Sequence, residues 1–135
     1  MEGVAVKENA HSPDDIVAAL YLYAGAVDFT SDKEIIHSTL NRLFEKYSRQ
    51  FSDLKELFTF CSDESYPFSK EVEGILIRLQ ISNVIIAENP TYNKYRVNLD
   101  ISRDIISEIE EYLSPPEITL LKTISKEFAE VCKVD

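Results

Sequence analysis

Glycine and cysteine are scarce in this chain of 135 residues, and each scarcity excludes a class of site. The three glycines are Gly3, Gly25 and Gly74, and no two of them have the spacing of a phosphate-binding or dinucleotide-binding loop. The two cysteines, Cys61 and Cys132, lie far apart and form no Cys-x-x-Cys pair. A disulfide scaffold is therefore excluded. We expect both cysteines to be buried free thiols, because each follows an apolar helical pattern.

A long apolar run is also missing. No window approaches the roughly 18 apolar residues that a membrane-spanning helix needs. Residues 1–10 lack the basic-then-apolar order of a signal peptide, so we expect a cytoplasmic protein with a flexible leader over residues 1–11. Hydrophobic residues make up 44% of the chain, which is enough to bury a core. The length suits a single domain over residues 12–135.

Helical periodicity and capping residues dominate the sequence. Ser12 followed by Pro13 predicts a helix start. Ser31 with Glu34 has the capping-box pattern, and Ser114 precedes two prolines. Between such signals, apolar residues recur at the three- and four-residue spacing of a helix. The expected helices cover residues 12 to about 25–28, 32–48, 53–61, 70–82, 101–113 and 115–132.

Between residues 84 and 99 the pattern changes to that of strands. Residues 84–87 form a β-branched run, and residues 89–93 have the composition of a turn. Residues 94–99 alternate between polar and apolar side chains. We therefore expect a β-hairpin whose buried face consists of Tyr95, Val97 and Leu99.

The order of three helices and a hairpin over residues 32–99 resembles that of winged helix-turn-helix domains. The resemblance implies a mainly α fold: a winged-helix-like core of three helices and a two-stranded β-hairpin wing, with one N-terminal and two C-terminal flanking helices. One departure is the connection over residues 62–68, which is longer than the usual three- to four-residue turn. Helices after a wing often form dimers in such proteins. The extension over residues 100–135 is thus expected either to fold back on the domain or to join two copies.

The helix expected at residues 70–82 would enter the major groove in a DNA-binding protein of that type. Its inner face has the spacing of core residues, with Val72, Ile75, Leu76 and Leu79. Its opposite face includes Gly74, Ile77 and Ile81, and the isoleucines offer no hydrogen bonds to bases. Three occupants stay open for this face: helices of the same chain, a second protein or subunit, or DNA. Because an apolar neighbour suits it best, these three residues are the candidate protein-interaction site.

Acidic residues outnumber basic ones and give a net charge of −10. Residues 1–40 and 104–135 each have a net charge of −5, whereas residues 41–103 are neutral. Duplex DNA is bound largely through lysines and arginines that neutralise phosphates, so this balance disfavours nucleic acid. A local patch can still act within an acidic protein. The alternative nucleic-acid site therefore consists of the wing residues Tyr92, Lys94 and Arg96, extended by Arg42, Lys46 and Arg49.

Catalytic and metal-binding patterns are weak. The chain has no His-Glu-x-x-His, phosphate-loop or Gly-x-Ser-x-Gly motif. His11 lies near Asp14 and Asp15, but helix capping explains this group better than a metal site. His37 and Cys61 are a base and a nucleophile by residue type. We do not expect them to act together, because the pattern places the histidine at the surface or boundary and the cysteine in the core.

We therefore expect no enzyme activity, no cofactor and no metal. The favoured function is a non-catalytic protein-interaction or assembly module that docks a partner or its own copy through apolar helix faces. The alternative is a winged-helix DNA-binding transcription regulator.

Overall fold

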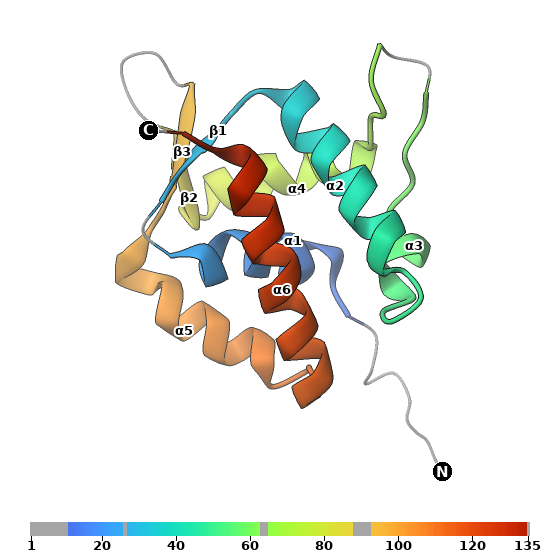
Figure 1. Ribbon diagram of the computed structural model, residues 1–135. Coiled ribbons are helices and arrows are strands. Elements are labelled where there is room, and N and C mark those ends of the chain that lie inside the picture. The colour runs from blue at the N-terminus through green and yellow to red at the C-terminus, as the bar shows by residue number, and fades with distance from the viewer. Residues whose placement is uncertain (1–10, 26, 63–64, 88–92, 135) are drawn as a thin grey trace.

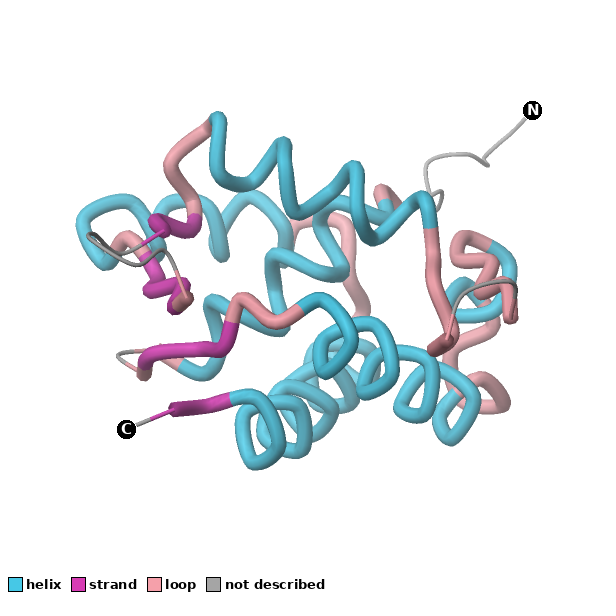
Figure 2. The backbone as a smooth tube through the Cα atoms, turned by 90° about the horizontal axis from the view of Figure 1, so that it is seen from above, coloured by secondary structure: helices cyan, strands magenta, loops and turns pink. Residues whose placement is uncertain are grey.

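The computed structural model describes residues 11–25, 27–62, 65–87 and 93–134. Within these ranges the chain is mainly helical, with six helices and a small antiparallel sheet of four strands. The strands gather at one end of the molecule, and most of the helical turns lie beside and beyond them (Figure 2). The expected leader over residues 1–11 falls almost wholly outside the described residues. None of the described helices is long and apolar enough to cross a membrane.

Helix α1 (Pro13–Ala24) lies at the centre of the core (Figure 1). Pro13 occupies the first turn with two acidic residues, as the sequence predicts, and the helix ends at Gly25, whose φ is 76°. The seven consecutive residues 16–22 are all buried. The expected N-terminal helix is therefore present, and it lies inside the core because α4 (Lys70–Ile81), α5 (Leu99–Glu110) and α6 (Pro115–Cys132) all pack against it.

The sheet has the strand order β2-β3-β1-β4. Strands β2 (Ile85–Ala87) and β3 (Lys94–Val97) form the expected hairpin. Strands β1 (Asp28–Thr30) and β4 (Lys133–Val134) extend it, which corrects the expected two-stranded wing. The strand β3 stops at Val97 because Asn98 caps α5, so Leu99 is exposed rather than on the buried face.

Helix α2 (Lys33–Tyr47) begins one residue later than the capping pattern predicts, because the Asp32 side chain accepts the hydrogen bond from the Ile35 amide. Helix α3 (Asp53–Glu56) has only four residues, so the helix expected to reach residue 61 is wrong. Cys61 instead pairs with Phe68 through two backbone hydrogen bonds of 2.8 and 2.9 Å. Cys61 is exposed, contrary to expectation, whereas Cys132 is buried as predicted.

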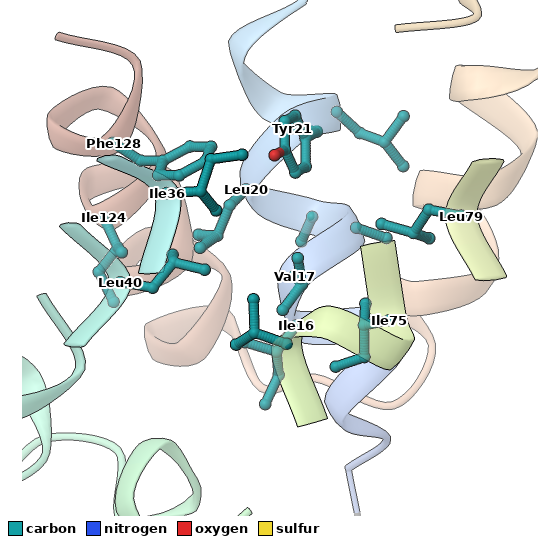
Figure 3. Close-up of a cluster of buried hydrophobic side chains, with 14 of the residues drawn as sticks. Ile16, Val17, Leu20, Tyr21, Ile36, Leu40, Ile75, Leu79, Ile124 and Phe128 are labelled. Carbon is teal, nitrogen blue, oxygen red and sulfur yellow. The ribbon is translucent and has the colours of Figure 1, made fainter. Parts of the chain in front are cut away.

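The core on one side of α1 is built by α6 and α2, and on the other side by α4 (Figure 3). Three aromatic rings meet beside the sheet, from Tyr21, Phe29 and Phe128, with centroids 4.7 to 5.5 Å apart. The capping box of Ser114 and Glu117 starts α6, as the sequence predicts. Helix α6 therefore folds back on the domain through its buried face, while α5 buries only Ile109 completely.

Candidate interaction surface

Helix α4 is fixed by a hydrogen-bonded start and a buried face. The Ser69 hydroxyl accepts from the Val72 amide, and the Ser69 amide donates to Nδ1 of His37 at 3.1 Å. The four predicted core residues of α4 are all buried: Val72, Ile75, Leu76 and Leu79. Because this inner face packs on α1, the opposite face of α4 points away from the core.

The outer face of α4, defined by Gly74, Ile77 and Ile81, is open. The exposed fraction is 49% for Ile77 and 76% for Ile81. The interpretation that flanking helices of the same chain cover these two residues is therefore wrong for the described part of the chain. Two branched apolar side chains lie one helical turn apart on this face. Removing them from water, by contact with another apolar surface, would lower the free energy.

Gly74 lies under the side chain of Arg78 from the same helix. A Cβ atom placed on Gly74 would lie 3.2 Å from Nη1 of Arg78 and 3.9 Å from its Cζ and Nη2, and these are the three nearest atoms outside the local backbone. Gly74 thus leaves room for the Arg78 guanidinium beside the helix backbone. The sequence-based expectation that Gly74 permits close approach of another element stays a prediction.

Two bases beside the outer face of α4, Arg78 and Lys33, are paired with acids, whereas Lys70 in its first turn has no salt bridge among the described residues. Arg78 donates from Nε and Nη2 to the two carboxylate oxygens of Asp14, at 2.6 and 2.9 Å. Glu73 accepts from Lys33 at 2.6 Å and lies 3.4 Å from Nε2 of His37. These contacts neutralise the bases Arg78 and Lys33, so they provide no electropositive groove beside Ile77 and Ile81.

His37 is buried, which corrects the expectation of a surface or boundary histidine. Its ring stacks on Phe68 with centroids 4.7 Å apart. Burial lowers the pKa of His37, although Glu73 opposes this shift. Since Nδ1 accepts from Ser69, the neutral ring has its proton on Nε2, facing Glu73. Both ring nitrogens are thus engaged, and none is left to act as a base for Cys61.

The basic residues of the alternative site fall into two groups. Lys94 and Arg96 lie on β3 next to β1, opposite Thr30 and Asp28, while Tyr92 lies outside the described residues. Tyr95 is buried, and its hydroxyl accepts from Gln80, so it does not extend this patch. The second group, Arg42, Lys46 and Arg49, lies on the C-terminal half of α2 and in the turn that follows it, away from the sheet (Figure 1).

Arg42, Lys46 and Arg49 line a shallow hollow of about 520 Å³ with Lys55. Lys46 also donates to Glu127 of α6 at 2.8 Å. A helix rises 1.5 Å per residue, so Arg42 lies roughly 14 Å along α2 from its start beside β1. The structure therefore brings Arg42, Lys46 and Arg49 together but does not join them to Lys94 and Arg96.

His11 contacts residues that no sequence pattern connects to it. Its Nδ1 lies 2.5 Å from Asp53, and its Nε2 lies 3.1 Å from the carbonyl oxygen of Tyr112. These contacts tie residue 11 to α3 and to the corner between α5 and α6. Within the described ranges no three His, Cys, Asp or Glu side chains form a potential metal site. Burial, together with Asp14 and Glu108, raises the pKa of Asp15 beside His11.

Sequence reasoning missed a groove between α1 and α6, with a volume of about 490 Å³. Lys122, Lys126 and Lys133 line it. Their spacing of four and seven residues places them on one side of a helix, and this signal is present in the sequence. The opposite wall of the groove is formed by α1. Only the tertiary structure shows that α1 lies beside these lysines.

No protein-family model matches the chain, and no curated protein or solved structure shows significant similarity to it.

Proposed function

We propose that this protein is a non-catalytic, winged-helix-like interaction or assembly module that docks a protein partner or its own copy through the outer face of α4. The order α1, β1, α2, α3, α4, β2, β3 supports the winged-helix interpretation, because it places a helix before a hairpin whose strand β3 pairs with a short strand after the first helix. The observation that carries the functional proposal is the exposure of Ile77 and Ile81 on a helix whose opposite face is buried.

The chemistry of the outer face favours a protein over DNA as its occupant. Isoleucine side chains have no groups that address base edges. Arg78 is engaged by Asp14, so it is not free to contact a phosphate. A small apolar centre flanked by the paired charges of Arg78 and Glu73 resembles the centre and rim of a protein interface. Docking would remove Ile77 and Ile81 from water while Arg78 stays paired with Asp14.

The double variant Ile77→Glu/Ile81→Glu tests this proposal. Because both side chains are exposed, the variant should keep the unfolding midpoint of the parent protein while losing self-association in sedimentation velocity, or losing a partner recovered by affinity capture. Val131→Glu is the matched control, since Val131 is 48% exposed on α6. The control should retain the association. If the parent neither self-associates nor captures any protein that the double variant loses, the proposal is wrong.

The alternative function is a winged-helix DNA-binding transcription regulator. One observation favours it: Arg42, Arg49 and Lys55 line one hollow in which Glu45 is the single acid, and no described acid forms a salt bridge with these three bases. Duplex binding measured by fluorescence anisotropy at about 50 mM salt tests it, because low salt favours any phosphate contact. Binding that Arg42→Ala/Arg49→Ala abolishes would support the regulator, and no binding to a long duplex would remove it.

A further inference from the structure

The groove between α1 and α6 is separate from the outer face of α4. Helices α4 and α6 pack on different sides of α1, as the positions of Ile75 and Ile124 show (Figure 3). The groove is lined by the C-terminal end of α1, by Val27 and by one side of α6. Its volume of about 490 Å³ falls in the range of ligand-binding clefts.

The charge of the groove is opposite to that of the chain. Residues 104–135 contain eight acids and three bases, and all three bases line the groove: Lys122, Lys126 and Lys133. Their side chains are exposed, and no salt bridge joins any of them to an acid in the described ranges. Lys46, by contrast, is paired with Glu127 on another side of α6. Glu130 is the one acid that lines the groove, which leaves an excess of positive charge.

The floor of the groove is apolar. Ala24, Val27 and Ala129 are half-buried and pack against the core. The ring of Tyr23 forms one wall, with Nζ of Lys122 5.5 Å from its centroid. The Tyr23 hydroxyl donates to Glu110 at 2.7 Å. Burial and this hydrogen bond raise the pKa of Tyr23, so the hydroxyl stays protonated and the ring stays in place.

The dimensions of the lysine row favour an extended occupant. Lys122 and Lys133 are 11 residues apart, which corresponds to roughly 16 Å along the helix direction. That length equals about three helical turns or five residues of extended chain. A segment of a protein can place acidic side chains along such a row and apolar side chains on the floor. A nucleic acid strand has no aliphatic side chains for the floor, and the acidic flanks of this chain repel a long polyanion.

We propose that the groove binds an acidic, amphipathic segment of a partner protein. Carboxylates of the segment pair with Lys122, Lys126 and Lys133, and apolar side chains cover Tyr23 and Ala129. This inference does not depend on the outer face of α4.

A selection from a random library of 12-residue displayed peptides, against the full chain, tests the inference. Enriched peptides should combine aspartate or glutamate with apolar residues. Fluorescence anisotropy of the selected peptides should show binding that the double variant Lys122→Glu/Lys126→Glu weakens about tenfold or more, because each reversal replaces attraction by repulsion. Lys55→Glu/Arg103→Glu is the matched control: it changes the net charge equally at exposed residues outside the groove, and it should bind as the parent does.

Two further variants locate the binding. Ala129→Arg should block the floor and abolish binding, while Ile77→Glu/Ile81→Glu should leave it unchanged. Circular dichroism melts of all variants show whether each remains folded. The inference is overturned if the library yields no binders, if the enriched peptides lack acidic residues, or if they bind the Lys122→Glu/Lys126→Glu variant as well as the parent. It is equally overturned if a dodecanoate or single-stranded oligonucleotide probe binds the groove and the peptides do not.

Discussion

Helices α1 and α4 have the same length of 12 residues and both have apolar residues on opposite sides, yet only α1 is covered all round. Seven consecutive residues of α1 are buried, and seven residues span almost two turns. On α4 the buried residues occupy one side, and Ile77 and Ile81 remain in solvent on the other. An apolar stripe in the sequence therefore indicates that burial of that helix face is favourable. It does not show whether the face is buried by the same chain or by a partner.

The difference follows from position. Helix α1 has α4, α5 and α6 against it, whereas α4 packs on α1 and on the neighbouring strand β2. Substitutions in α1 should therefore change the free energy of unfolding most. Substitutions on the outer face of α4 should mainly change binding.

Leu20→Ala in α1 should have the largest effect. Leu20 is fully buried, so its truncation should lower the free energy of unfolding by about 3 kcal/mol through lost burial and a residual cavity. Ile81→Ala on α4 should change it by about 0.5 kcal/mol or less. Urea unfolding with an unchanged slope measures both. Equal losses for the two variants would show that Ile81 is covered in the folded monomer.

The start of α4 should make stability depend on pH. Burial lowers the pKa of His37 in the folded state, so the unfolded chain binds a proton more readily. The ordinary pKa of histidine is about 6.5. The stabilisation from neutral His37 is therefore complete above about pH 6.5 and is lost as the pH falls below that value. Protonation of Nδ1 would break its hydrogen bond from the Ser69 amide.

Urea titrations at several pH values between 7 and 5 check this dependence. Asp15 contributes with the opposite sign, because its raised pKa makes the folded state bind a proton first. His37→Gln separates the two contributions: it should be less stable than the parent at pH 7 and should have a flatter profile. An unchanged profile in this variant would exclude His37 as the source.

Much of the helical architecture could be predicted from local sequence. Ser114 with Glu117, and Ser69 before an amphipathic run, specify helix starts through contacts within four residues. Strands β1 and β4 could not be predicted, because segments of three and two residues are too short for a periodic pattern. The helix expected to reach residue 61 failed for a related reason: the bridge from Cys61 to Phe68 competes with helix formation.

The candidate surface could be predicted only in part. The two-sided pattern of α4 identified Ile77 and Ile81, but their exposure depends on where α5 and α6 pack. The contact of His11 with Asp53 joins residues 42 apart and leaves no local signal. The spacing of the lysines in the α1–α6 groove can be read from the sequence. That they line a groove depends on the apolar residues of α1, which only the tertiary structure places beside them.

Tyr21→Phe in α1 should stabilise the protein. The Tyr21 hydroxyl is buried, and among the described residues it has no hydrogen-bond partner. Removing an unsatisfied buried hydroxyl should raise the free energy of unfolding by about 1 kcal/mol, while the ring keeps its contacts with Phe29 and Phe128. Thermal and urea unfolding measure the change. A loss of stability would mean that the hydroxyl has a partner, such as a buried water.

The contact that joins the two helices, Asp14 of α1 with Arg78 of α4, should have the smallest effect. The pair is bidentate but largely exposed, so solvent and salt screen it. A double-mutant cycle with Asp14→Asn and Arg78→Gln isolates its coupling, because Asp14 also favours the start of α1 in a way that does not involve Arg78. The coupling should be smaller than the gain from Tyr21→Phe and should vanish at about 0.5 M salt. A large, salt-independent coupling would mean that α1 and α4 are held together by charge rather than by the buried face between them.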